Sequence, residues 1–172
     1  MTDSSPPPDT ATATTLDHYN RRAVEFEAGT RDHDVSQNIA ALLEHIEGRA
    51  PFRILDLGCG PGDIPVRLAR ALPDCRITGI DASRPMIALA EQAVRQAGVA
   101  DRVTVRCERF QDLAGANQAD AVISNSLLHH LPNPLQFWHK LRLFVKPGSP
   151  VLVMDLLRPE SPEAAQIGRA HV

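Results

Sequence analysis

The stretch Ile54–Asp63, which reads ILDLGCGPGD, contains the residues best suited to binding a ligand. Three glycines, Gly58, Gly60 and Gly62, occupy alternate positions directly after an apolar run. Glycines between a strand and a helix let the backbone turn tightly, so that a ligand can approach the N–H groups at the start of the helix. The pattern therefore predicts a ligand-binding loop.

The spacing of these glycines distinguishes between kinds of nucleotide site. A dinucleotide-binding loop has the pattern G-x-G-x-x-G, and a mononucleotide P-loop ends in Gly-Lys-Ser/Thr. This chain has G-x-G-x-G without the lysine. Asp56 lies two residues before the first glycine, and its carboxylate would repel a pyrophosphate but suits an ammonium group. We therefore expect a zwitterionic ligand.

A second carboxylate, Asp81, ends the apolar run of ITGIDAS. At the end of a parallel strand, a carboxylate can accept hydrogen bonds from the hydroxyls of a ribose. Capping of the next helix competes with this interpretation, because Ser83 follows closely. With the glycine loop, Asp81 predicts a site for a nucleoside that carries an amino acid.

The elements that position these residues follow from the hydrophobic pattern. After Pro51, short apolar runs alternate with amphipathic segments, which is typical of an α/β fold with a Rossmann-like, doubly wound and mostly parallel sheet. The expected strands are 52–57, 76–80, 103–107, 121–124 and 151–156. The expected helices are 16–29, 34–48, 63–72, 83–97 and 134–145. Asp34 and Gln37 are predicted to form a capping box, Asn133 to cap the last helix, and Trp138, Leu141 and Val145 to face the core.

Composition limits the classes of partner. The chain of 172 residues has 18 basic and 21 acidic side chains and a net charge of −3, which argues against binding to nucleic acid or an anionic membrane. No apolar run approaches membrane-spanning length. Cys59, Cys75 and Cys107 lack the spacing of a disulfide framework or a metal site, so we expect no metal and a cytoplasmic location.

The two ends of the chain differ from its middle. Residues 1–15 are rich in Pro, Thr, Ser and Ala and are expected to form a disordered leader. A single domain is expected over 16–160, with N-terminal helices in 16–48 and a core in 52–157, followed by a tail at 161–172.

Four segments, in this order, resemble the motifs of class I S-adenosylmethionine-dependent methyltransferases, in particular the small-molecule group typified by quinone-biosynthesis C-methyltransferases. They are LDLGCGPGD, GIDASRPMI, ADAVISNSLLHHLPNP and LRLFVKPGSPVLVMD. The resemblance implies the strand order 3-2-1-4-5, S-adenosylmethionine as cofactor, and methyl transfer to an unidentified small-molecule acceptor by in-line displacement.

The resemblance also implies roles for individual residues. Asp56 would lie near the ammonium of the cofactor and Asp81 at its ribose, while Tyr19 would close over it and Asn125 would line the methionine pocket. His130 is a weak candidate for a catalytic base, and a structural or pocket-wall histidine is the preferred interpretation. The other implied contacts are Gly58, Cys59, Gly60 and Gly62 along the methionine part, Ala82 and Met86 beside the adenine, and Glu108 or a backbone amide near Arg109 and Phe110 at the adenine amino group.

The end of the chain raises two further expectations. The family's sheet normally has seven strands, so strands six and seven are expected to be missing, with the fifth strand as an exposed edge. Residues 167–172, IGRAHV, match a translation of the start of a widely used sequencing adapter, which suggests read-through at the end of a truncated reading frame. The alternatives to an active methyltransferase are a cofactor-binding fragment without turnover and, more distantly, an NAD-dependent oxidoreductase.

Overall fold

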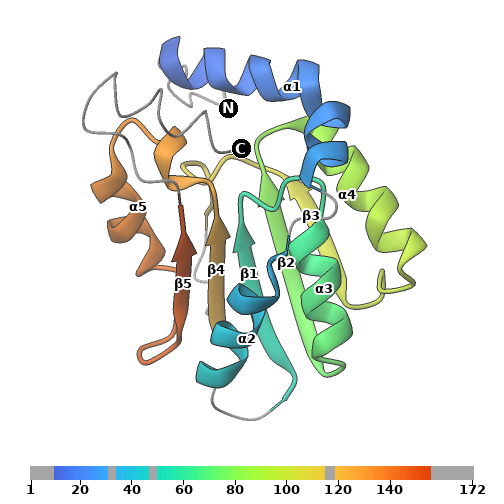
Figure 1. Cartoon of the computed structure of the whole chain (residues 1–172). Helices are drawn as coiled ribbons and strands as arrows, with labels where there is room; N and C mark the ends of the chain where they lie inside the picture. The colour runs from blue at the N-terminus through green and yellow to red at the C-terminus, as the bar shows by residue number, and fades with distance from the viewer. Residues whose placement is uncertain (1–9, 31–33, 47–49, 115–118, 156–172) are drawn as a thin grey trace, which may run out of the picture.

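A five-stranded parallel sheet with the order β3-β2-β1-β4-β5 forms the centre of the molecule, as predicted (Figure 1). The computed structural model describes residues 10–30, 34–46, 50–114 and 119–155. The strands are β1 (Phe52–Leu57), β2 (Cys75–Asp81), β3 (Val103–Cys107), β4 (Ala121–Asn125) and β5 (Val151–Met154). Since β1 lies between β2 and β4, the chain changes direction across the sheet there, and ligands of open α/β folds bind at this point.

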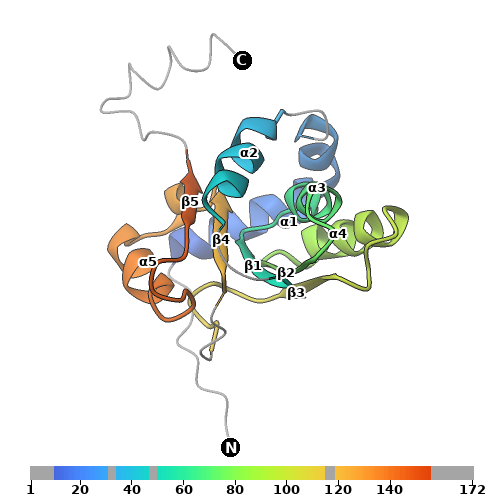
Figure 2. The same cartoon turned by 90° about the horizontal axis from the view of Figure 1, so that it is seen from below.

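Helices cover both faces of the sheet. Figure 2 shows α2, α3 and α4 on one face and α5 on the other, while α1 crosses the carboxyl ends of the strands in Figure 1. The helices are α1 (Thr10–Thr30), α2 (Ser36–His45), α3 (Asp63–Ala71), α4 (Arg84–Gln96) and α5 (Pro134–Leu141), with the short 3₁₀ helix η1 at Leu128–His130.

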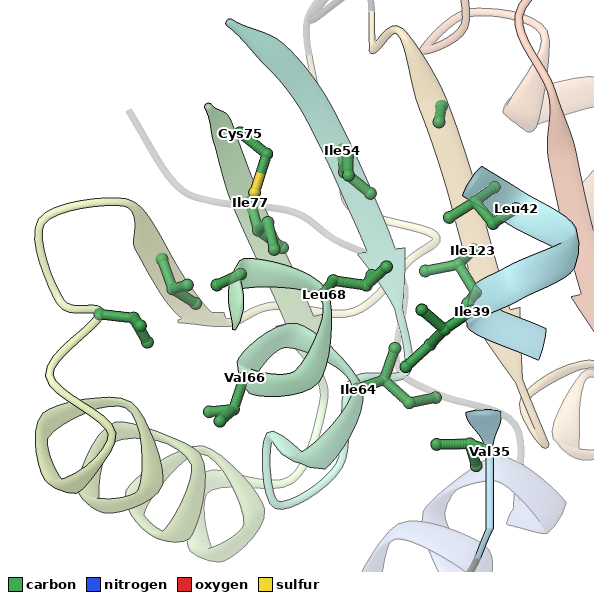
Figure 3. Packing of buried hydrophobic residues seen from close by; sticks show 14 of the residues in the cluster. Val35, Ile39, Leu42, Ile54, Ile64, Val66, Leu68, Cys75, Ile77 and Ile123 are labelled. Carbon is green, nitrogen blue, oxygen red and sulfur yellow. The ribbon is translucent and has the colours of Figure 1, made fainter. Parts of the chain in front are cut away.

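The core has two parts because strand side chains alternate between the faces of the sheet. Ile54, Ile77 and Ile123 pack against Leu68 of α3 and Ile39 of α2 (Figure 3). The other face joins strand residues to α5 and the segment after it, and its buried members include Leu55, Leu57, Val122, Phe137 and Phe144.

Local chemistry sets the helix that follows β2 and the one that follows η1. Ser83 is the N-cap of α4, and its Oγ accepts a hydrogen bond from the Met86 N–H at 3.4 Å. Asn133 caps α5 by accepting from the Leu135 N–H at 3.0 Å. Both helices have proline in the first turn, where the missing N–H costs nothing. The cap at Asn133 confirms the sequence prediction.

The first two helices begin at other residues than predicted. Helix α1 begins at Thr10, inside the segment expected to be a disordered leader. Extending an existing helix costs less than nucleating one, so the threonines and alanines before Leu16 can continue it. Val35 is the N-cap of α2, so the predicted Asp34–Gln37 capping box was wrong. Asp34 instead accepts the N–H of Ser36 at 2.9 Å in a local turn.

Helix α5 is shorter than predicted and buries a different face. It ends at Leu141 rather than Val145, and Trp138 is 42% exposed whereas Phe137 is 0% exposed. Phe137 and Leu141 lie four residues apart and form the buried stripe instead. The tail 161–172, the adapter-like 167–172 and residues 1–9 lie outside the described residues.

Candidate active site

A cavity of about 250 Å³ lies at the carboxyl ends of the strands, and residues of α1 form part of its wall. The glycine loop, the end of β2, the segment after β3, the end of β4 and η1 supply the other walls. Most of the residues predicted from the sequence lie on it: Tyr19, Gly58, Cys59, Gly60, Asp81, Ala82, Met86, Glu108, Arg109, Phe110, Asn125 and His130. Of the residues predicted from the sequence, Asp56 and Gly62 do not line this cavity.

The glycine loop leaves open space on the cavity side. The N–H groups of Gly58 and Cys59 both donate to the Ile80 carbonyl at 2.9 Å, which holds the loop against the end of β2. Gly60 has a φ of 51°, in the left-handed region that favours glycine, and a Cβ added there would meet no atom within 4 Å. A ligand can therefore approach the backbone closely at Gly60.

Asp81 connects this loop to α4. Its Oδ2 accepts the Gly60 N–H at 3.0 Å and its Oδ1 accepts the Ser83 N–H at 2.8 Å. Since Ser83 itself caps α4, the capping alternative for Asp81 is not what the structure has. Burial raises the pKa of Asp81, and the two backbone hydrogen bonds oppose that rise. Each carboxylate oxygen keeps a lone pair that can accept a ligand hydroxyl.

Asp56 is completely buried and is not part of the cavity wall. Neither of its carboxylate oxygens has a hydrogen-bond partner among the described residues. Burial, and then the nearby charge of Asp81, raise the pKa of Asp56 to about 8. Alternation along β1 places its side chain on the same face as Ile54, beneath the loop rather than in the cavity. The site therefore contains a buried carboxyl group that carries a proton near neutral pH.

Gly62 serves packing between helices rather than the cavity. Its φ is 90°, and an added Cβ would lie 2.9 Å from both the Cα and the Cβ of Ala90 in α4. The Gly62 carbonyl accepts from the Val66 N–H at 3.1 Å as α3 begins. The third glycine of the loop is thus required for the close approach of α3 and α4.

Helix α1 covers the cavity and is tied to it at two points. The Tyr19 hydroxyl and the His130 Nε2 are 2.9 Å apart in a hydrogen bond between residues 111 positions apart. The Ser83 Oγ donates to the Asn20 Oδ1 at 2.8 Å, which links α1 to the start of α4. Sequence reasoning missed three apolar cavity residues of the N-terminal segment, whose only signal was their apolar character: Leu16, Phe26 and Val35.

The two histidines of η1 have different surroundings. His129 Nδ1 lies 2.5 Å from the Asp155 Oδ1, and Asp155 Oδ2 also accepts the Leu128 N–H at 2.5 Å. Burial, and then the neighbouring His129, lower the pKa of His130 to about 4. His130 is therefore neutral at pH 7, and its Nε2 is hydrogen-bonded to Tyr19. This arrangement fits His130 as a residue of the cavity wall.

The far wall follows β3 and β4. Glu108 donates its N–H to the Asp81 carbonyl at 2.9 Å, and its side chain lies 2.5 Å from the Arg106 guanidinium. Asn125 ends β4, and Ser126 next to it has a φ of 59°. Left-handed backbone at a residue other than glycine is strained and concentrates at functional sites. Ser126 lines the cavity and was missed, because its backbone conformation leaves no mark in the sequence.

The described part of the chain contains no group of three or more His, Cys, Asp or Glu side chains placed to hold a metal ion. None of its helices has the length and apolar character needed to cross a bilayer.

Residues 54–148 match the family described as methyltransferase domain. The chain is 33% identical to demethylmenaquinone methyltransferase of Lactiplantibacillus plantarum over 147 residues, which are 84% of this chain and 60% of that protein. The chain thus spans less than two thirds of the length of this relative.

Solved structures share the fold. The cyclase SpnF superposes with a TM-score of 0.75 at 22% identity, over 92% of this chain and 64% of that one. DhpI, in the structure described as the DhpI-SAM-HEP complex, has a TM-score of 0.67 at 26% identity, over 97% of this chain and 75% of that one. The likeness to SpnF shows the fold alone, because proteins with this fold carry out different reactions.

Proposed function

Because the chain belongs to the methyltransferase domain family, we propose that it binds S-adenosylmethionine and transfers the methyl group to a small-molecule acceptor by in-line displacement. The observation that carries the proposal is the position of Asp81. Its carboxylate lies on the cavity wall and is fixed by the N–H of Gly60, so a ribose acceptor and an open glycine loop share one site.

The residues present fit this cofactor. The open space beside Gly60 suits the methionine part, and the Asp81 carboxylate suits the ribose hydroxyls. Met86 and Phe110 are buried apolar side chains of the same wall and suit the adenine. The protonated Asp56 beneath the loop adds no negative charge at neutral pH unless an ammonium group approaches. A dinucleotide fits less well, because the loop lacks the G-x-G-x-x-G spacing.

The cofactor supplies a sulfonium-bound methyl group that is already strongly electrophilic. The chain's own residues then have to align an acceptor and exclude water. Tyr19, held by His130, and Phe26 next to it cover the cavity from α1, with ring centroids 5.3 Å apart. A base is needed only for an acceptor that must lose a proton, and the neutral His130 is a candidate that would first have to release Tyr19.

The acceptor is proposed to be a small molecule with an apolar body. The wall on the side of α1 and η1 is largely apolar and includes Leu16, Phe26, Val35 and Leu131. We also propose a cytoplasmic location, since Cys59, Cys75 and Cys107 are all free thiols.

Calorimetric titration with S-adenosylmethionine and S-adenosylhomocysteine tests the proposal. Asp81→Asn removes a charged acceptor and is expected to weaken both about tenfold or more. Asp74→Asn, an exposed aspartate just before β2, is the matched control and should leave both affinities unchanged. Binding of NAD without S-adenosylmethionine would overturn the proposal. Binding without methyl transfer to any acceptor would favour the cofactor-binding fragment.

A further inference from the structure

A second cavity, of about 260 Å³, lies on the sheet face that carries α5, over β1, β2 and β3. It shares no lining residue with the first cavity. Four arginines line it, Arg53, Arg76, Arg102 and Arg106, and a single carboxylate, Asp101. The lining thus holds more basic than acidic side chains, whereas the chain as a whole has a net charge of −3.

The register of the sheet brings two of these arginines together. Arg53 of β1 is the direct neighbour of Arg76 of β2, and both side chains project from the same face of the sheet. Like charges opposite each other on neighbouring strands destabilise a sheet. Two residues after Arg76 on β2, Thr78 is the direct neighbour of Thr104 on β3, so two hydroxyl groups lie beside the arginines.

The charges of the arginines are balanced to different extents. Arg102 donates to the carbonyls of Ala69 and Leu72 at the end of α3, and Arg106 pairs with Glu108. Arg53 lies 3.8 Å from Asp120, a carboxylate that also pairs with Lys146. Arg76 is exposed and has neither an ion pair nor a side-chain hydrogen bond within the described residues.

The helices of the described residues leave this part of the sheet face uncovered (Figure 2). Figure 2 shows α5 on this face beside β4 and β5, and no described helix covers β2 and β3 there. Here the outward positions of β2 and β3 on this face are Arg76, Thr78, Thr104 and Arg106, none of which is acidic.

We propose that this groove, formed by Arg53, Arg76, Thr78, Thr104 and Arg106, binds a small molecule that carries phosphate groups. A guanidinium group matches the geometry of phosphate oxygens with two parallel N–H donors, and hydroxyl groups donate to the remaining oxygens. A bound phosphate would also remove the repulsion between Arg53 and Arg76. The volume is sufficient for a group the size of pyrophosphate.

Inorganic pyrophosphate is the probe, titrated at constant ionic strength into the whole chain and followed by amide chemical shifts. Shifts are expected at Thr78 and Thr104, with an affinity about tenfold lower in Arg76→Gln and in Arg53→Gln. Arg70→Gln, an exposed arginine on α3, is the matched control and should bind like the wild type. The result does not depend on methyl transfer or on S-adenosylmethionine binding.

Four outcomes would overturn the inference. The first is the absence of binding. The second is a set of shifts at Gly58–Gly62, which would place the anion in the first cavity. The third is an equal loss in Arg70→Gln, which would indicate a general charge effect. The fourth is binding of a polyglutamate peptide but not of pyrophosphate, which would assign the groove to an acidic protein partner.

Discussion

Ile54 and Asp56 lie two residues apart on β1 and project from the same face of the sheet, yet their surroundings differ. Ile54 packs among apolar side chains from β2, β4 and α3. Asp56 is equally buried, but its carboxylate has no partner among the described residues. The residues that follow β1 and β4 also depart from regular structure, with left-handed backbone at Gly58, Gly60 and Ser126. The apolar middle of the sheet therefore supplies stability that offsets the unfavourable features at its carboxyl edge.

The largest effect is expected at Asp56. Its pKa is about 8 in the folded chain and near 3.8 when unfolded, so the unfolded state loses its proton first. The free energy of unfolding should therefore fall as the pH rises from about 4 to 8, by up to about 1.4 kcal/mol per pH unit from this group. Asp56→Asn should remove that slope, which urea unfolding at several pH values measures.

The pH range matters because His130 acts in the opposite direction. Its pKa falls from 6.5 to about 4 on folding, so its contribution to stability rises with pH between those values and is constant above them. The slope of Asp56 is therefore cleanest between pH 6.5 and 8. Asp74→Asn, which changes an exposed carboxylate, should keep the wild-type slope. Equal slopes in wild type and Asp56→Asn would show that Asp56 is already ionised in the fold.

The next effect separates two glycines of the same loop. Gly62→Ala places a Cβ 2.9 Å from Ala90 at a φ of 90°. Overpacking and backbone strain together should therefore lower the free energy of unfolding by about 3 kcal/mol. Gly60→Ala meets no atom at a φ of 51° and should cost about 1 kcal/mol. Chemical denaturation of both variants measures the difference.

The two substitutions should have the opposite order of effect on ligand affinity. Gly60→Ala fills space beside the open cavity and should weaken S-adenosylhomocysteine binding, whereas folded Gly62→Ala should bind nearly as well as the wild type. An equal cost in stability for both substitutions would contradict the assignment of Gly62 to helix packing.

How far the sequence predicted the molecule depends on the range of the interactions involved. β1 and β3 have the predicted bounds, because apolar runs with turn residues on either side are local signals. Helical spacing alone does not decide which face of α5 is buried, since Leu141 lies on one face with Phe137 and equally with Trp138. The choice between them depends on what the sheet presents to the helix.

The site shows the same division. Gly60 and Asp81 were predictable because loop glycines and strand-end carboxylates act through their immediate neighbours. The cover supplied by α1 depends on Tyr19 and His130, which are 111 positions apart, so no spacing rule indicates it. The burial of Asp56 away from the cavity depends on the path of the loop above it, which the pattern of glycines does not specify.

The smallest effect is expected where α1 meets the carboxyl edge. Tyr19→Phe keeps the ring contacts with Phe26 and His130 but removes the hydroxyl. It should therefore cost about 1 kcal/mol of the free energy of ligand binding. The same loss should appear as a roughly fivefold weaker affinity for S-adenosylhomocysteine, because α1 then closes less firmly over the cavity. Arg21→Gln, an exposed change on the same helix, is the matched control and should leave the affinity unchanged.

A double-mutant cycle decides whether that loss belongs to the hydrogen bond between Tyr19 and His130. His130→Ala removes the partner of the hydroxyl, so adding Tyr19→Phe to it should cost less in affinity than Tyr19→Phe alone. Since the pKa of His130 is about 4, this coupling should be constant from pH 6 to 8 and should weaken only as the ring gains a proton near pH 4. Additive losses across that range would mean that the hydroxyl acts on the ligand directly, and that α1 is held by Asn20 and Ser83 instead.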